Sequence, residues 1–102
     1  MSSPEAPRRV ILAPRARQDF IDILRYTGET WGPKQLQVYR DKIDEALQLL
    51  ARSSGLGHYR PDLPDTHRAY LVGSHVVIYR DHETKIAVVR ILHQRMSLAE
   101  HI

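Results

Sequence analysis

Residues 67–92 read HRAYLVGSHVVIYRDHETKIAVVRIL, and this stretch decides the fold. It contains three runs rich in β-branched and aromatic residues, at His67–Val72, His75–Arg80 and Lys85–Leu92. Gly73-Ser74 predicts a two-residue hairpin turn with glycine first, and the polar residues 81–84 predict a longer turn, so each run is expected to pair antiparallel with the next. The second and third runs carry consecutive apolar residues, which is typical of strands covered on both faces.

Two amphipathic helices are expected before these strands. Pro14 suits the first turn of a helix, and apolar residues then recur at three- and four-residue steps, namely Ala16, Phe20, Ile23, Leu24, Thr27 and Trp31. Gly32-Pro33 ends this helix and starts a second one, whose apolar seam is Leu36, Tyr39, Ile43, Ala46, Leu47 and Leu50. Ser53-Ser54-Gly55 ends the second helix. The short connection predicts an antiparallel helical hairpin.

A short apolar run, Arg8–Leu12, precedes the helices and is stopped by Ala13-Pro14, so it predicts a first strand. The order β-α-α-β-β-β then predicts an α+β domain, with the helical hairpin packed on one face of a small, mostly antiparallel sheet. Residues 1–7 are expected to form a flexible tail and residues 8–102 a single domain. Residues 55–65 are expected to form a loop, and residues 96–102 a short helical turn.

The composition excludes several classes of protein. The chain has 102 residues and no cysteine, which excludes a disulfide framework, a thiolate zinc site and a cysteine nucleophile. No apolar run approaches the roughly 20 residues of a membrane span, and the polar N-terminus does not resemble a signal peptide, so we expect a cytoplasmic protein without membrane contact. The net charge of +3 is spread over both halves of the chain, so direct sequence-specific DNA binding is not expected.

The histidines and arginines are the candidates for chemistry. Six histidines are widely spaced, without the i, i+4 pairing of a metal-binding helix, so neither a metal nor a cofactor is expected. Six basic residues are expected to gather on one sheet edge as a cationic cleft: Arg60, Arg68, Arg80, Arg90, His93 and Arg95. Such a cleft binds phosphate, or cleaves RNA by general acid–base chemistry. The alternative is that Arg90 pairs with a helix carboxylate such as Asp22 and the other side chains are solvated.

Four stretches of the chain resemble the RelE/ParE superfamily of bacterial toxins, and in particular its ParE branch. They are Pro14 to Tyr26; Gly32, Gln35 and Tyr39 with Leu50-Ala51; Gly57 with Arg60-Pro61-Asp62-Leu63, Arg68 to Gly73 and Val76 to Arg80; and Val89 to Met96, the most specific. Together they span about residues 8–98, and the predicted order of elements is that of the family.

The resemblance to ParE implies a target and a partner. The target would be DNA gyrase, poisoned so that replication stops, and the partner would be a ParD-like antitoxin that forms a hetero-oligomer with the toxin and neutralises it. On this interpretation the protein is not an enzyme, because it acts by binding one. The residues expected to bind gyrase or carry toxicity are the six basic residues of the proposed cleft.

The RelE-like branch of the superfamily cleaves mRNA on the ribosome and is the second hypothesis. That branch carries an arginine just before a Leu-Val-Tyr run in the middle strand, and here Val76 occupies that place. If the chain were nevertheless a nuclease, the catalytic residues would be His93, Arg95 and His101. A third hypothesis keeps the fold without toxicity, as an orphan member.

Apolar residues that lie off the helix stripes indicate where an antitoxin would bind. They are Ile21, Val38 and Leu49. A small sheet with helices on one face is also expected to leave its other face uncovered, and leftover apolar surface on a small domain usually marks a protein-binding site. The alternative is that these are isolated surface residues, which are common.

Overall fold

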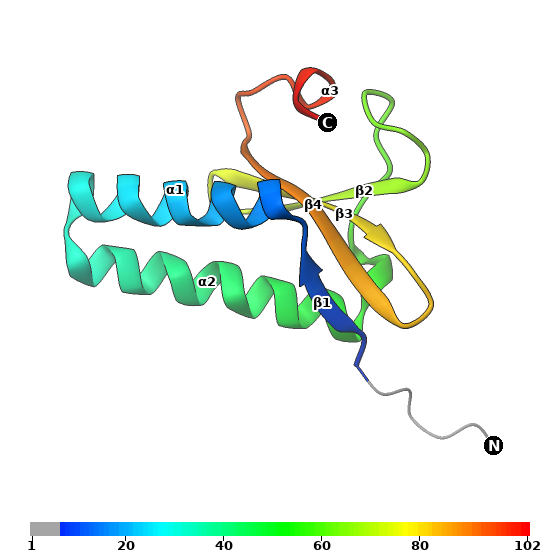
Figure 1. The fold of residues 1–102 in the computed structure, drawn as a ribbon, viewed down its shortest axis with the longest axis horizontal. Helices are drawn as coiled ribbons and strands as arrows, with labels where there is room; N and C mark the ends of the chain where they lie inside the picture. The colour runs from blue at the N-terminus through cyan, green and yellow to red at the C-terminus, as the bar shows by residue number, and fades with distance from the viewer. Residues whose placement is uncertain (1–6) are drawn as a thin grey trace.

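The computed structural model describes residues 7–102 of the chain (Figure 1). The elements are β1 (Arg9–Leu12), α1 (Pro14–Trp31), α2 (Pro33–Arg52), the 3-10 turn η1 (Ser54–Leu56), β2 (His67–Val72), β3 (His75–Asp81), β4 (Lys85–His93) and α3 (Leu98–His101). The predicted α+β class and element order are confirmed. All of the expected N-terminal tail except Pro7 lies outside the described residues.

The four strands form one mixed sheet in the order β1-β4-β3-β2. β2 pairs antiparallel with β3, and β3 pairs antiparallel with β4, as predicted from the two turns. β1 pairs parallel with β4, so the first and last strands of the chain lie side by side. The sheet is therefore mostly antiparallel, and β4 is one of its two central strands.

Two glycines make the turns that the sequence predicts. Gly32 has φ 93°, and its N–H donates to the Gly28 carbonyl at the end of α1, while Pro33 occupies the start of α2. Gly73 has φ 58°, and no residue other than glycine has a positive φ in the described part of the chain. Positive φ at the first turn position alone matches the predicted glycine-first hairpin between β2 and β3.

The helical hairpin packs on one face of the sheet and forms the larger core. Its buried residues come from α1, α2, β2, β3 and β4, and among them are Ala16, Ile23, Ile43, Leu47, Leu50, Val77, Tyr79, Ile86 and Val88. Val10 and Leu12 of β1 are partly buried against them. Tyr79 is fully buried, donates its hydroxyl to the Ser54 carbonyl at 2.6 Å and accepts the Gly57 N–H at 2.9 Å. These bonds fasten η1 to the centre of the sheet.

The other face of the sheet is covered too, by a smaller core. Leu63 from the loop before β2 and Leu98 from α3 pack with Ala69, Val76, Ile78 and Leu92. Figure 1 shows α3 and this loop on the side of the sheet opposite α2. The expectation that this face of the sheet is uncovered is therefore wrong, because the loop before β2 and the C-terminal segment both fold back over it. The prediction that β3 and β4 are covered on both faces is confirmed.

A bulge in β4 changes which residues face the helices. Ile78 pairs with Arg90 and Tyr79 pairs with Val88, so Val89 is an extra residue without a partner on β3. Before the bulge Ile86 and Val88 belong to the larger core, and after it Ile91 does, while Leu92 belongs to the smaller core. Without the extra residue, Arg90 would continue the alternation of Ile86 and Val88 and face the helices. The bulge places it on the opposite face of the sheet.

Candidate functional site

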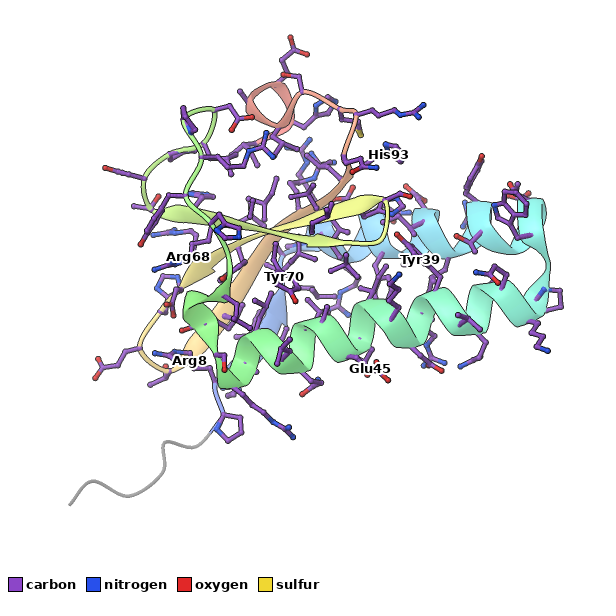
Figure 2. All side chains as sticks on the ribbon, turned by 180° about the vertical axis from the view of Figure 1, so that it is seen from behind. Arg8, Tyr39, Glu45, Arg68, Tyr70 and His93 are labelled. Carbon is purple, nitrogen blue, oxygen red and sulfur yellow. The ribbon has the colours of Figure 1, made fainter. Side chains whose placement is uncertain are left out.

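The predicted cationic cleft on one sheet edge does not form. His75 pairs with His93 at one end of the β3–β4 ladder, whereas Arg80 pairs with Ala87 near its other end. Five residues of strand separate His75 from Arg80, which is about 17 Å. Arg68 and His93 also lie well apart (Figure 2). The expectation that strand order would gather these cations was wrong, because Arg68 and Arg80 lie toward one end of the sheet and His93 lies at the other.

Two of the arginines are engaged locally in the segment around the start of β2. Arg60 makes two hydrogen bonds to the Asp62 carboxylate, at 2.9 and 2.8 Å, on the surface. The Arg68 guanidinium lies 4.2 Å from the centre of the Tyr59 ring and donates to the Gly57 carbonyl at 3.0 Å. Arg60, in the loop before β2, and Arg68, in β2, thus each have a partner within residues 57–62.

Arg90 is a structural residue with only 9% of its surface exposed. Its guanidinium donates twice to the Asp19 carboxylate, at 2.8 and 2.9 Å, and once to the His101 carbonyl at 2.6 Å. The bond to Asp19 raises the pKa of Arg90 further above its ordinary value. Pairing with a helix carboxylate is thus confirmed, although the partner is Asp19 and not Asp22. Three of the five guanidinium N–H groups of Arg90 are therefore held within the protein.

The three residues named for a nuclease occupy the end of β4 and the C-terminal segment. The Nδ1 atom of His93 accepts the backbone N–H of Arg95 at 3.1 Å, so these two residues form one turn after β4. The side chain of Arg95 is exposed. The Nδ1 atom of His101 bonds the Ser97 carbonyl at 2.8 Å within α3. A catalytic role for these side chains remains a prediction.

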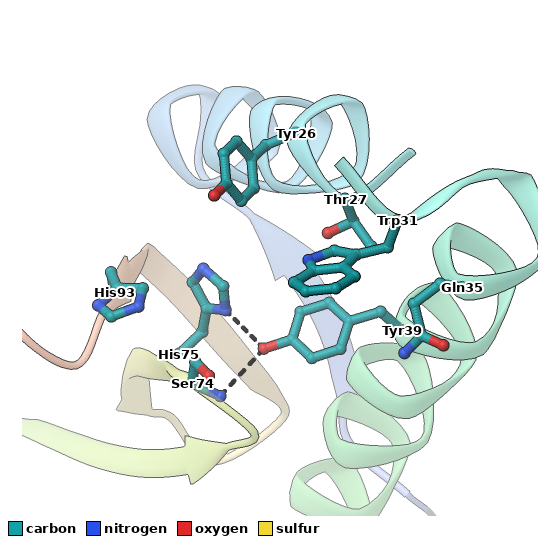
Figure 3. A pocket seen from close by; sticks show the side chains of 8 residues that line it. All are labelled: Tyr26, Thr27, Trp31, Gln35, Tyr39, Ser74, His75 and His93. Atoms are coloured by element: carbon teal, nitrogen blue, oxygen red, sulfur yellow. Dashed lines mark hydrogen bonds between the residues drawn. The ribbon is translucent and has the colours of Figure 1, made fainter. Parts of the chain in front are cut away.

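A groove that sequence reasoning missed lies between the tip of the helical hairpin and the ends of β3 and β4 (Figure 3). Its larger compartment, of about 500 Å³, is lined by Tyr26, Thr27, Trp31, Gln35, Tyr39, Ser74, His75 and His93. A smaller compartment of about 240 Å³ shares Tyr26, His75 and His93 with the first and continues past Asp19 and Asp22 to Met96. We call these two compartments together the α1 groove.

Trp31 shows why the groove was missed. Helical periodicity places it in the apolar stripe of α1, yet 70% of its surface is exposed. The tip of the hairpin extends beyond the sheet, so no strand lies opposite the last turn of α1 (Figure 1). Tyr26 is also highly exposed, at 66%. The sequence feature that could have indicated the groove is the presence of two large aromatic residues, Tyr26 and Trp31, in the last six positions of α1.

Tyr39 holds the floor of the groove in place. Its hydroxyl accepts the Ser74 N–H at 3.2 Å and lies 2.5 Å from Nδ1 of His75, and the His75 ring is edge-on to His93 with their centres 5.3 Å apart. Burial raises the pKa of Tyr39 and lowers the pKa of His75, which the nearby charge of His93 lowers further. The hydrogen bonds join α2 to the β2–β3 turn and fix the imidazole.

The residues predicted to bind an antitoxin, Ile21, Val38 and Leu49, are all exposed. Val38 and Leu49 lie eleven residues apart, which places them on one side of α2 about 16 Å from each other. None of the three lines the α1 groove. Their exposure agrees with the prediction, and their role stays a prediction.

Residues 7–102 contain neither a metal-binding cluster nor a membrane-spanning helix. No group of three or more His, Asp or Glu side chains is placed to hold a metal ion there. No helix in the same range is long and apolar enough to cross a membrane.

Comparison with known proteins places the chain among toxins. Residues 10–98 match the family described as ParE toxin of type II toxin-antitoxin system, parDE. The chain is 32% identical to Toxin ParE1 of Caulobacter vibrioides over 91 residues, which covers 89% of this chain and 94% of that protein. It is 33% identical to Toxin ParE of Escherichia coli over 89 residues, covering 86% of each.

Two solved structures share the fold. One comes from the chromosomal ParDE system of P. aeruginosa, with a TM-score of 0.72 and 18% identity, and it covers 84% of this chain and 95% of that one. The other comes from the toxin–antitoxin complex RelBE2 of Mycobacterium tuberculosis, with a TM-score of 0.60 and 20% identity, and it covers 87% of this chain and 100% of that one.

Proposed function

The chain belongs to the ParE toxin family of type II toxin–antitoxin systems, and from this we propose that it binds DNA gyrase and blocks replication. The observation that carries the proposal is the family match over residues 10–98, which spans both helices and all four strands. On this proposal the protein acts in the cytoplasm by binding an enzyme, and it catalyses no reaction itself.

The environment of Val76 supports gyrase over the ribosome as the target. Val76 occupies the place of the arginine that the mRNA-cleaving branch uses, and it is 4% exposed within the smaller core. A buried valine offers no charge to a phosphate in the transition state. Arg90 on the neighbouring strand β4 is buried and has its charge paired with Asp19.

We further propose that a ParD-like antitoxin neutralises the toxin by forming a hetero-oligomer with it. The similar chain from P. aeruginosa belongs to a ParDE system, which supports this kind of partner. The exposed apolar residues Ile21, Val38 and Leu49 offer contact surface for such a partner on the two long helices. If the antitoxin covers these three residues in the complex, their exposure in the free toxin is explained.

The decisive experiment combines the purified toxin with purified gyrase and supercoiled DNA. We expect gyrase–DNA cleavage complexes to accumulate, and cells that express the toxin to become filamentous. The same toxin preparation is added to a translating extract, where mRNA should remain intact. Cleavage of translated mRNA with unaffected gyrase would establish the RelE-like function instead, and the absence of both effects would indicate a non-toxic member of the family.

The exposed arginine after β4 provides a test of the predicted toxicity residues. Arg95→Ala is expected to reduce the gyrase effect by about tenfold, because a surface cation that contacts a partner contributes on the order of 1–2 kcal/mol. Antitoxin binding should persist. Arg40→Ala, on the exposed side of α2, is the matched control and should behave like the natural protein. Equal loss of gyrase and antitoxin binding would instead indicate a role in folding.

A further inference from the structure

The aromatic rings of the α1 groove are placed to receive a ligand. Tyr26 and Trp31 project from the last two turns of α1 and remain mostly exposed, while Tyr39 forms the floor below Trp31 (Figure 3). The face of an aromatic ring carries partial negative charge and attracts cations, with tryptophan the strongest. Three rings around one opening therefore favour a cationic group.

The smaller compartment adds a negative charge without a cation to balance it. Asp19 and Asp22 both line this compartment. Asp19 is paired with Arg90, whereas Asp22 accepts a hydrogen bond only from the Gln18 amide at 2.9 Å and has no ion pair among residues 7–102. The groove thus places an available carboxylate beside Tyr26, the aromatic ring that lines both compartments.

No resident cation competes for this position. Arg90 is the sole lysine or arginine among the lining residues described, and its charge is already paired with Asp19. The two imidazoles, His75 and His93, are held against each other, and burial keeps the pKa of His75 below its ordinary value, so that ring is neutral at pH 7. The open space is therefore apolar, aromatic and locally anionic.

We propose that the α1 groove binds an arginine side chain of the antitoxin, with the guanidinium against the Tyr26 ring and directed toward Asp22, and with the rest of the side chain extending toward Trp31. Arginine suits the groove better than lysine, because its planar guanidinium stacks on aromatic faces and is less strongly hydrated. A volume of about 500 Å³ exceeds a single side chain, so neighbouring residues of the antitoxin enter with it. The identity of the partner rests on the proposed function, whereas recognition of arginine does not.

The first test is a titration with N-acetyl-arginine amide, read out by Trp31, the sole tryptophan of the chain. We expect a saturable change in Trp31 fluorescence. N-acetyl-citrulline amide, which has nearly the same shape without the charge, should bind about fivefold more weakly or worse. Equal binding of the two probes would overturn the proposal, and so would tighter binding of N-acetyl-glutamate amide.

Matched variants locate the binding in the groove. Asp22→Asn should weaken N-acetyl-arginine amide about two- to fivefold, and Tyr26→Ala should weaken it by a similar factor. Asp44→Asn on α2 and Tyr59→Ala on the loop before β2 change an exposed residue of the same type outside the groove. Both controls should bind as the natural protein does, and unchanged thermal unfolding confirms that each variant is folded. Equal effects of variants and controls would place the probe elsewhere.

The antitoxin is tested with the purified toxin–antitoxin complex. If an antitoxin arginine fills the groove, the NMR signal of the Trp31 indole in the complex should not respond to N-acetyl-arginine amide. An undiminished response in the complex would overturn the assignment to the antitoxin. Neither titration contains gyrase, so a failed gyrase assay and a failed arginine titration are separate results.

Discussion

At the scale of single residues, the Asp19 carboxylate joins three parts of the chain. It receives two hydrogen bonds from Arg90 on β4 and one from the backbone N–H of Ile91 at 3.0 Å, and Arg90 in turn holds the carbonyl of His101 in α3. The Arg90 and Asp19 side chains are only 11% and 14% exposed. Removing one partner of a buried pair leaves the other charge without compensation.

Asp19→Ala is therefore expected to lower the free energy of unfolding by about 2–4 kcal/mol, because it leaves the Arg90 guanidinium and the Ile91 N–H without their acceptor. Urea unfolding monitored by circular dichroism measures the change. Asp22→Ala, one turn along the same helix and exposed, is the control and should change stability by less than about 0.5 kcal/mol. Similar losses in the two variants would mean that the Asp19–Arg90 contact adds little.

The Gly73 position tests the turn between β2 and β3. Its φ of 58° disfavours a side chain, and a Cβ there would come within 2.8 Å of the Tyr39 ring. Gly73→Ala should destabilise the fold by about 1–3 kcal/mol and disturb the floor of the α1 groove. Gly55→Ala is the control, since a Cβ at Gly55 has no neighbour within 4 Å. Equal stability of both variants in urea unfolding would contradict the strain at this turn.

His75 makes part of the stability depend on pH. Its pKa in the folded state is lowered by burial and by His93, while Tyr39 from α2 and the groove residues Tyr26 and Asp22 from α1 complete its surroundings. The unfolded chain therefore binds a proton at this ring more readily than the folded chain does. The contribution of the neutral His75 ring to the free energy of unfolding is fully present above the ordinary histidine pKa of about 6.5. It is lost as the pH falls below that value.

We expect unfolding free energies measured between pH 8 and pH 5 to fall less steeply in His75→Gln than in the natural protein. The exposed His58 supplies the control, and His58→Gln should keep the natural slope. A slope in His75→Gln equal to that of the natural protein would show that burial of this ring does not link folding to protonation.

At the scale of elements, α3 is attached through the buried side chain of Leu98 and through the hydrogen bond from Arg90 to the His101 carbonyl. Leu98 is 2% exposed and completes the smaller core together with Leu63. Leu98→Ala should cost about 2–4 kcal/mol and free the C-terminal segment, which carries Arg95. Leu71→Ala on β2 removes a leucine that is 58% exposed and should cost less than about 0.5 kcal/mol. Hydrogen exchange at residues 94–102 tests whether the segment is released in Leu98→Ala alone.

The elements themselves could be predicted because their signals are local. Period-3.6 stripes, Gly32-Pro33 and Gly73-Ser74 place α1, α2, β2, β3 and β4 to within about one residue. The bulge at Val89 has no comparable signal, and simple alternation would have put Arg90 on the helix-covered face. The separation of Arg80 from His93 likewise depends on strand register, which is set by tertiary packing.

The α1 groove could not be predicted for a related reason. Periodicity shows which side of a helix is apolar, but it does not show whether another element lies opposite. Trp31 belongs to the stripe and is nevertheless exposed, because the hairpin is longer than the sheet is wide at that end. Charge alone indicates the candidate arginines, and it does not show which of them are buried. Arg90 is buried, and its charge is paired with Asp19.

At the scale of the whole molecule, the net charge of +3 and the local charge of the α1 groove have opposite signs. The positive net charge attracts an acidic partner, and the negative charge of the α1 groove suits an arginine within that partner. We therefore expect that raising NaCl from 0.05 to 0.5 M slows association of toxin and antitoxin, since screening weakens the long-range attraction. The dissociation rate should change less, which stopped-flow fluorescence of Trp31 measures; a salt-independent association rate would exclude such steering.

The position of β4 has a consequence for biosynthesis. It supplies the only strand partner described for β1 and one of the two neighbours of β3, yet it follows β1, both long helices, β2 and β3 in the chain and leaves the ribosome after them. Translation proceeds from the N-terminus, so a nascent chain that ends before residue 85 lacks Ile86 and Val88 of one core and Leu92 and Leu98 of the other. A message truncated before codon 85, or a ribosome stalled there, therefore yields a polypeptide with neither core complete, and the folded surfaces form only after residues 85–98 have been translated.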